Sequence, residues 1–243
     1  MEPIETGNYL VRLWDHQNQE DLKEVQKLRY DYLLKDFDED KTSPDGLDDD
    51  GWDDISDSIL VFDKKTGRIV GTYRLATDET LRGAAYKSEE EFNISSFRSE
   101  PEGILEAGRA VVHKDYRSGR VISLLWKALI TYAQTHHLRY IFGTCSLHGT
   151  DPDVYQKCTS YLNQYCLSDR FDIRAVRNAF EYGTMKDLSL QDAEMPALLR
   201  AYLQMGGKVS RNGYIDYEFR SCDVMVVLDC QHLNEKFVNF FMR

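Results

Sequence analysis

Residues 104–126 have the sequence ILEAGRAVVHKDYRSGRVISLLW, in which an apolar, β-branched run is followed by a basic turn and an amphipathic segment. The run predicts a strand, the residues from Lys114 to Arg120 predict a turn, and the apolar spacing after Val121 predicts a helix. A strand that leads through backbone amides into a helix N-terminus is suited to binding an anionic group. The stretch therefore predicts an α/β architecture with an anion site at the turn.

The flanking sequence extends this pattern on both sides. Two strand-like runs, 58–63 and 68–77, are joined by a Lys-Lys-Thr-Gly turn, which is typical of a hairpin. Residues 20–34 have helical apolar spacing. The order of elements predicts an α/β fold around one mixed sheet, in a single domain over residues 1–243. The other expected strands are 8–14, 103–112, 139–146, 214–219 and 224–228, and the other expected helices are 121–137, 152–167, 196–204 and 233–242.

The charge of the chain is concentrated in one segment. The 243 residues have a net charge of −11, and residues 36–57 hold 11 acidic side chains and a single lysine. The rest of the chain has 30 acidic and 29 basic residues, so it is nearly neutral. Nucleic acid is not expected as a partner, because phosphate binding needs a basic face. The acidic loop at 36–57 could instead attract a cationic substrate.

Several classes of protein are excluded by what the sequence lacks. The five cysteines are scattered without a CxxC pair, so neither a metal site nor a redox motif is predicted, and free thiols in a reducing compartment are expected. The chain has no apolar run of 18 residues and no signal-like start, which favours a cytoplasmic location. Peripheral membrane contact stays open, since four residues near the C-terminus could touch a bilayer or cap the core: Phe237, Phe240, Phe241 and Met242.

The strand before the turn carries a carboxylate and a guanidinium three residues apart, Glu106 and Arg109. A carboxylate can take the proton from an amine nucleophile, and an N–H donor or arginine can stabilise an oxyanion. This chemistry suits acyl transfer from a phosphopantetheine thioester to an amine. In a regular strand the two side chains point to opposite faces, but a bulge at Gly108 would bring them to one side. Alternatively, Arg109 pairs with the acidic loop as a structural clamp.

Several ordered blocks resemble one branch of the GNAT superfamily, the ornithine-lipid-forming acyltransferases and related bacterial N-acyl amino acid synthases. The blocks are LRYDYLLKD (28–36), DDISDSILVFDKKTGRIVGTYRL (53–75), YKSEEEFNIS (86–95), LEAGRAVVHKDYRSGRVISLLWKAL (105–129), YIFGTCSLHGTDP (140–152) and PALLRAYLQMGGKV (196–209). The resemblance implies a GNAT-like, mainly antiparallel sheet flanked by helices. It also implies transfer of a long-chain, often 3-hydroxylated acyl group from acyl carrier protein to the α-amine of an amino acid such as ornithine, with no bound cofactor.

The same resemblance suggests roles for particular residues. The layout is similar to that of acyl-homoserine lactone synthases, whose characteristic positions correspond here to Arg29, Asp57, Arg74, Glu106 and Arg109. It implies Glu106 as the base, with Arg74 and Arg109 shaping the acyl and carrier site. Substrate-binding candidates are Arg29, Asp57, Arg74 and Ser146.

The turn supplies the candidates for binding phosphopantetheine and the carrier protein, which are Lys114, Arg117, Gly119 and Arg120. Acetyl-CoA-dependent GNATs have a (Q/R)xxGx(G/A) loop, whereas Arg120 and Ile122 replace its small residues here. This departure favours a donor without an adenosine diphosphate group. Because acyl carrier protein is acidic, Lys127 and the three basic residues of the turn form a reasonable docking patch.

Two other functions remain compatible with the sequence. The first is a signal synthase of the acyl-homoserine lactone type. The second is a non-catalytic regulator that binds an acyl group or a carrier protein. In the favoured interpretation, Asp57 or the acidic loop steers a cationic amino acid toward Glu106.

Overall fold

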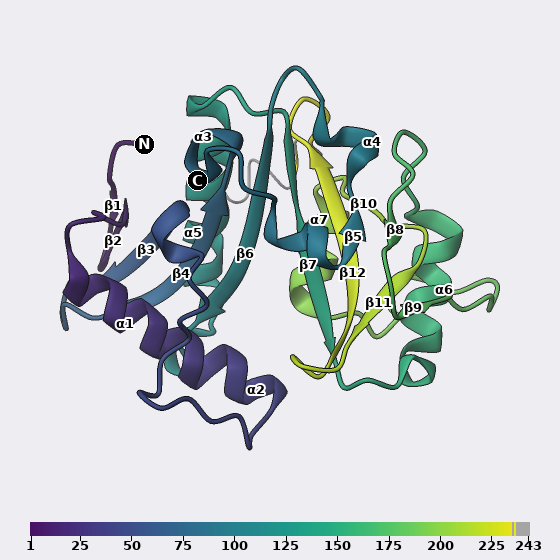
Figure 1. Cartoon of the computed structure of the whole chain (residues 1–243), viewed down its shortest axis with the longest axis horizontal. Helices are drawn as coiled ribbons and strands as arrows, with labels where there is room; N and C mark the ends of the chain where they lie inside the picture. The colour runs from purple at the N-terminus through teal and green to yellow at the C-terminus, as the bar shows by residue number, and fades with distance from the viewer. Residues whose placement is uncertain (235, 237–243) are drawn as a thin grey trace. The chain divides into compact units, whose positions relative to one another are not determined.

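The computed structural model describes residues 1–234 and 236 (Figure 1). The chain forms two compact units, one of residues 1–84 and 105–138 and the other of residues 85–104 and 139 to the end of the described part. Each unit combines helices with antiparallel strands, which confirms the predicted mixed α/β class. The single domain over 1–243 stays a prediction. The expected helix at 233–242 and the four residues considered for membrane contact lie almost wholly outside the described residues.

The first unit has a five-stranded antiparallel sheet in the order β1-β2-β3-β4-β6. Its strands are β1 (Ile4–Thr6), β2 (Tyr9–Leu13), β3 (Asp57–Asp63), β4 (Ile69–Ala76) and β6 (Ile104–Val112). The β3–β4 pair is the predicted hairpin, and β1 is a short strand that the sequence pattern did not indicate. Strand β6 lies at the end of this order, so the candidate residues Glu106 and Arg109 lie beside β4.

One face of this sheet is covered by the first helix. Helix α1 (Gln19–Arg29) is capped by Asn18 and continues through a π-helical turn (Tyr30–Leu34) into α2 (Lys35–Phe37). Val25 and Leu28 of α1 join a buried cluster with Leu60 of β3 and Val111 of β6. We call this side the α1 face; Figure 1 shows α1 running across the strands.

The opposite face packs against α5 (Arg120–Thr135), the helix predicted after the basic turn. A Cβ atom on Gly71 would lie 2.5 Å from Cγ1 of Val121, so close packing of β4 and α5 requires a glycine there. Tyr73 and Trp126 also meet edge to face across this contact. The remaining helical turns of this unit are Asp53–Ile55, α3 (Asp78–Leu81) and Lys114–Tyr116.

The second unit has a sheet in the order β7-β12-β11-β9, with β10 also paired to β12. Its strands are β7 (Tyr140–His148), β9 (Ala179–Phe180), β10 (Lys208–Val209), β11 (Gly213–Asp216) and β12 (Ser221–Asp229), and β5 (Phe92–Asn93) pairs separately with β8 (Arg174–Ala175). Its helices are α4 (Ser95–Arg98), α6 (Gln156–Tyr165) and α7 (Ala197–Gln204), with 3-10 turns at Lys87–Glu90 and Pro152–Tyr155.

The helix predicted at 152–167 is shorter than expected. Asp151 accepts a hydrogen bond from the Asp153 amide, but the first turn is a 3-10 helix and α6 ends at Tyr165. Segment 183–185 packs tightly on α6, because the amides of Gly183 and Met185 donate to side-chain hydroxyls of that helix. The position of α6 is therefore fixed by these tertiary hydrogen bonds, since its N-cap residue Tyr155 makes no side-chain capping bond.

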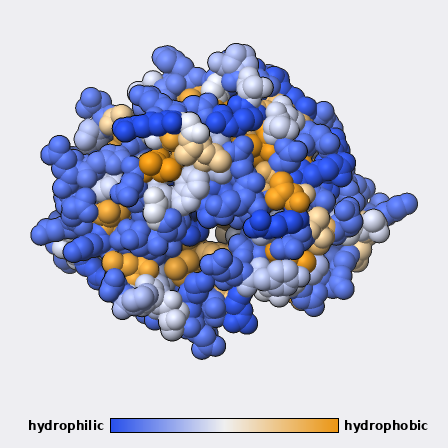
Figure 2. All heavy atoms as spheres, viewed as in Figure 1, coloured by the Kyte–Doolittle hydropathy of each residue, from blue (hydrophilic) through white to orange (hydrophobic). Residues whose placement is uncertain are grey.

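The surface is mainly polar on the side shown in Figure 2, where hydrophobic residues form small separate groups. All five cysteines are free thiols and four are buried, as the sequence predicts. Within the described residues, no helix is both long and apolar enough to cross a bilayer.

Candidate functional site

Strand β6 leaves regular pairing at the candidate residues. Ala76, Leu75 and Arg74 of β4 face Glu106, Ala107 and Gly108, but the next pair is Thr72 with Val111. Two residues of β6, Arg109 and Ala110, therefore stand opposite one residue of β4, which is a β-bulge. Arg109 has a φ of 53° and supplies the left-handed conformation. The predicted bulge is present, and it is formed by Arg109 rather than by Gly108.

Glu106 and Gly108 share the α1 face, because they are two residues apart on the regular part of β6 and oppose Ala76 and Arg74. Glu106 is buried, with 8% of its surface exposed. A Cβ atom on Gly108 would meet no heavy atom within 4 Å. Packing within the protein therefore does not require a glycine at position 108. Open space lies over Gly108, which is the next residue after Glu106 on the same face of β6.

Arg29 is wholly buried and is held by two aspartates of the acidic loop. Its Nη1 and Nη2 donate to Oδ1 and Oδ2 of Asp53 at 2.8 and 2.6 Å, and Nη2 also donates to the Asp48 carbonyl at 2.7 Å. Burial acts to raise the pKa of Asp53, but its hydrogen bond and charge contact with Arg29 outweigh burial and lower the pKa. Burial acts to lower the pKa of Arg29, and Asp53 and Asp48 raise it. Both side chains therefore stay charged at neutral pH.

The other two arginines bind the same loop. Arg74 donates to both oxygens of Asp50 at 2.6 and 2.9 Å. Arg109 donates through Nε to Asp48 at 3.0 Å and through Nη2 to Asp50 at 3.1 Å. Burial acts to raise the pKa of Asp50, but Arg74 and then Arg109 hold it well below its usual range. Three aspartates and three arginines thus form one compensated group, which we call the arginine–aspartate cluster.

This cluster changes how the acidic loop is understood. Asp48, Asp50 and Asp53 neutralise internal arginines, so they add no net field that could attract a substrate. Arg109 fulfils the alternative role of a clamp, and the bulge directs it to the same side as Arg74. Arg74 is 6% exposed, so it is not a surface cation. The sequence indicated the three arginines, but not which of the 11 acidic residues pair with them.

Asp57 is not a member of the cluster. It lies on β3, where its Oδ2 accepts a hydrogen bond from the Tyr132 hydroxyl at 2.7 Å and its Oδ1 contacts Nε2 of His16 at 3.0 Å. Burial and then the charge of Asp57 raise the pKa of Tyr132. Ser146 lies in the second unit, on β7, paired in register with Asp223 of β12.

The basic turn forms as predicted, and its members differ in how they are used. Arg117 donates to the Val112 carbonyl at 3.0 Å and to Asp36 at 2.8 Å, which ties the turn to α2. Arg120 donates to Oγ1 of Thr6 at 2.9 Å. Gly119 is the N-cap residue of α5 with a φ of 96°, and Lys114 is exposed. The turn thus presents a glycine-capped helix start with basic side chains around it.

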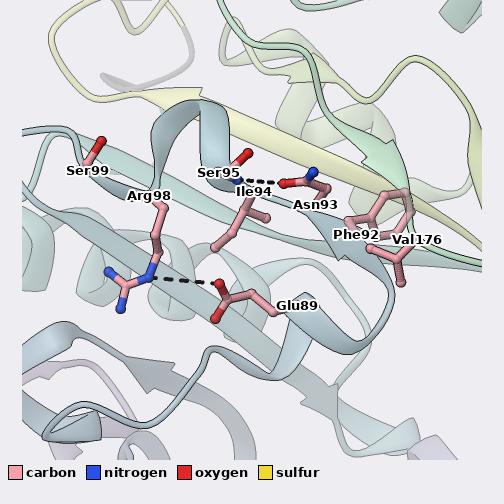
Figure 3. Close-up of a pocket in the computed structure, with 8 residues that line it drawn as sticks. All are labelled: Glu89, Phe92, Asn93, Ile94, Ser95, Arg98, Ser99 and Val176. Carbon is pink, nitrogen blue, oxygen red and sulfur yellow. Dashed lines mark hydrogen bonds and ion pairs between the residues drawn. The ribbon is translucent and has the colours of Figure 1, made fainter.

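A pocket of about 440 Å³ lies in the second unit, and Figure 3 shows its wall. Phe92, Ile94 and Val176 provide apolar surface. Glu89 and Arg98 point toward each other, with 3.9 Å between Oε1 and Nε. The eight described residues that line it include none of the predicted site residues.

Comparison with known proteins identifies the family. The chain is 30% identical over 211 residues to an L-ornithine N(alpha)-acyltransferase of Rhodobacter capsulatus, covering 81% of this chain and 80% of the relative. It is also 30% identical over 209 residues to the enzyme of the same name from Brucella abortus, covering 79% of this chain and 73% of the relative. The chain belongs to the L-ornithine N(alpha)-acyltransferase family. A family model described as an acetyltransferase (GNAT) domain also matches residues 28–127, and the protein is an acyltransferase.

Solved structures support the GNAT-like fold of this family member. A CoA-dependent acyl-homoserine lactone synthase, BjaI, matches with a TM-score of 0.57 and 13% identity over 96% of this chain and 87% of the other. An aminoglycoside 6'-N-acetyltransferase with coenzyme A matches with a TM-score of 0.50 and 13% identity over 90% of this chain and 96% of the other. At these identities the likeness shows the fold alone.

Proposed function

We propose that this protein transfers a long-chain fatty acyl group, 3-hydroxylated in the preferred donor, from acyl carrier protein to the α-amine of ornithine. The product would be an N-acyl ornithine, the lyso form of an ornithine lipid. The observation that carries the proposal is the bulged strand β6, with buried Glu106 beside open space at Gly108, in a chain that belongs to this family.

In the proposed reaction, Glu106 accepts a proton from the α-ammonium group, directly or through one water. The freed amine attacks the thioester carbonyl carbon, a C–N bond forms, and the carbonyl electron pair moves to oxygen. Collapse of this intermediate breaks the C–S bond, and the leaving phosphopantetheine thiolate takes up the proton that the attacking nitrogen loses as the amide forms. A thioester is already activated for this step, so the chemistry needs no resident cofactor.

The bulge gives β6 a second role in this proposal. The extra residue of a bulge bends its strand and changes the direction of the side chains beside it. The bulge begins directly after Gly108, two residues from Glu106, so it would set the direction in which β6 leaves the candidate site. The arginine–aspartate cluster would then fix the bulge, and Arg109 would act as a positioning residue.

We propose that the donor is acyl carrier protein because the turn at 114–120 combines basic side chains with a helix start. The exposed Lys114 and the bases Arg117 and Arg120 would meet an acidic carrier, and the amides after Gly119 would bind the phosphopantetheine phosphate. The proposed setting is the cytoplasm, which agrees with five free thiols.

The test combines purified full-length protein, 3-hydroxyacyl and unsubstituted acyl carrier protein, acyl-CoA, and single amino acids. N-acyl product is measured by mass spectrometry and released thiol by a colorimetric reagent. We expect N-acyl ornithine from the carrier-bound donor, and a 10²–10⁴-fold lower kcat/KM for Glu106→Gln, roughly the range of general-base catalysis. Absence of N-acyl product and thiol release with every amino acid would refute the proposal. A lactone product from S-adenosylmethionine would indicate a signal synthase instead.

A further inference from the structure

The second unit contains three carboxylates that are close in space, two from the consecutive strands β11 and β12 and one from a segment much earlier in the chain. Glu91 precedes β5, Asp216 ends β11, and Asp223 lies in β12. One carboxylate oxygen from each lies within 4.8 Å of the others. This group, the carboxylate triad, has no role in the proposed acyl transfer.

The sheet register places Asp216 and Asp223 of the triad on one polar face. Tyr214 and Ser146 are the residues paired with Asp223 on either side, and Asp216 is paired with Ser221. Asp216 is held in a fixed orientation, because its Oδ1 accepts hydrogen bonds from the amides of Glu218 and Phe219 at 2.8 and 2.7 Å. The triad is therefore built from ordered strand ends rather than from mobile surface side chains.

Asp223 supplies an independent sign that a ligand belongs there. It is 2% exposed, its Oδ2 accepts a hydrogen bond from the Ser221 hydroxyl at 3.1 Å, and its Oδ1 has no hydrogen-bond partner among the described residues. A buried carboxylate with an unpartnered oxygen next to further carboxylates is unfavourable unless a proton or a bound cation compensates its charge.

We propose that Glu91, Asp216 and Asp223 bind a hard divalent cation such as Ca²⁺ or Mn²⁺. Such ions take carboxylate oxygens at roughly 2.3–2.6 Å, so two ligands of one ion are at most about 5 Å apart. The spacing of the triad satisfies this limit for all three residues. All ligands are oxygens, which favours Ca²⁺, Mg²⁺ or Mn²⁺ over Zn²⁺. The ion would join the segment before β5 to β11 and β12 and stabilise the second unit.

The test uses chelator-treated full-length protein titrated with Tb³⁺, a luminescent ion that substitutes for Ca²⁺ in oxygen sites. Directly opposite residues on paired strands have Cβ atoms roughly 4.5–5.5 Å apart, so Tyr214 lies close enough to Asp223 to excite a bound ion. We expect saturable luminescence that Ca²⁺ displaces, and a higher Tm in the presence of Ca²⁺ or Mn²⁺. No saturable signal together with an unchanged Tm would overturn the proposal.

Variants make the test specific. Asp223→Asn should weaken Tb³⁺ binding by at least about tenfold through loss of a charged ligand. In metal-free protein the same change should raise the Tm, because it removes a buried carboxylate from its neighbours. Asp216→Asn serves as a second ligand variant if Asp223→Asn does not fold. The exposed Asp169, changed to Asn, is the matched control and should alter neither quantity.

Two outcomes would contradict the metal site. Unaltered Tb³⁺ binding in both ligand variants would place the ion elsewhere. If L-ornithine raises the Tm and none of Ca²⁺, Mg²⁺ and Mn²⁺ does, the triad binds an organic ammonium group instead of a metal ion. Neither measurement depends on turnover, so the result stands whether or not the proposed acyl transfer is correct.

Discussion

The change Asp53→Asn tests whether the arginine–aspartate cluster holds the first unit together. Asp53 is 3% exposed and Arg29 is 0% exposed, and two hydrogen bonds of 2.8 and 2.6 Å join them. Asparagine keeps the size of the side chain but removes its charge and replaces one acceptor oxygen with a donor. The guanidinium of Arg29 would then be buried with much of its compensation lost.

Removing one partner of a buried ion pair costs about 3–5 kcal/mol of unfolding free energy. For a chain of this size, 1 kcal/mol shifts the Tm by about 2–4 °C, so the expected decrease in Tm is roughly 6–20 °C. Asp48 still contacts Arg29, which favours the lower part of this range.

The three tryptophans, Trp14, Trp52 and Trp126, all lie in the first unit, so urea unfolding followed by tryptophan fluorescence reports on it directly. Asp54→Asn is the matched control, because Asp54 is the exposed neighbour and surface changes are usually worth about 0.5 kcal/mol or less. In the double variant Arg29→Met/Asp53→Leu, the loss should be smaller than the sum of the single losses. Equal unfolding midpoints for Asp53→Asn and Asp54→Asn would refute the reasoning.

Two further predictions concern the candidate site and the effect of pH. Gly108→Ala should fold with an unchanged Tm, since a Cβ there meets nothing within 4 Å, but it should lower acyl transfer at least about tenfold by occupying space beside Glu106. Tm and turnover measured together check this prediction. Burial lowers the pKa of His113, so the unfolded chain takes up a proton there at higher pH than the folded chain does. Stability should therefore fall as the pH drops below about 6.5 toward the lowered folded pKa. His113→Asn keeps an acceptor for the Asp115 amide and should remove this part of the pH dependence of the unfolding free energy. The exposed His137, changed to Asn, is the control and should leave that pH dependence unchanged. The same pH dependence of the unfolding free energy in the original protein and both variants would contradict the argument.

The elements predicted correctly were those with strong local signals. The β3–β4 hairpin has alternating apolar residues and a turn sequence, and α5 has a clear apolar stripe after a glycine. The short strands β1, β8 and β9 have two or three residues each, too few to show a period. Their existence depends on pairing partners that local sequence does not specify.

The sequence indicated which residues of β6 belong to the candidate site, but not which residues they pair with. Glu106 and Arg109 were singled out by residue type and spacing, and the bulge between them was expected from Gly108. The left-handed residue is Arg109 because Asp48 and Asp50 hold its side chain from a distance in sequence. Charged residues are usually exposed, so the loop aspartates were not expected inside. The carboxylate triad had no sequence signal, since the β11–β12 register brings Asp216 and Asp223 together and Glu91 joins them from the distant segment before β5.

The arginine–aspartate cluster also has a consequence for the order of events during synthesis. Arg29 leaves the ribosome first, the loop aspartates follow, and Arg109 comes last of the six. At the usual elongation rate of about 5–20 residues per second, the interval between Arg29 and Arg109 is roughly 4–16 s. Throughout that interval the nascent loop has an incomplete set of counter-ions and stays hydrated. We therefore expect the N-terminal helix to complete its docking only after β6, the last strand of its sheet, has been translated.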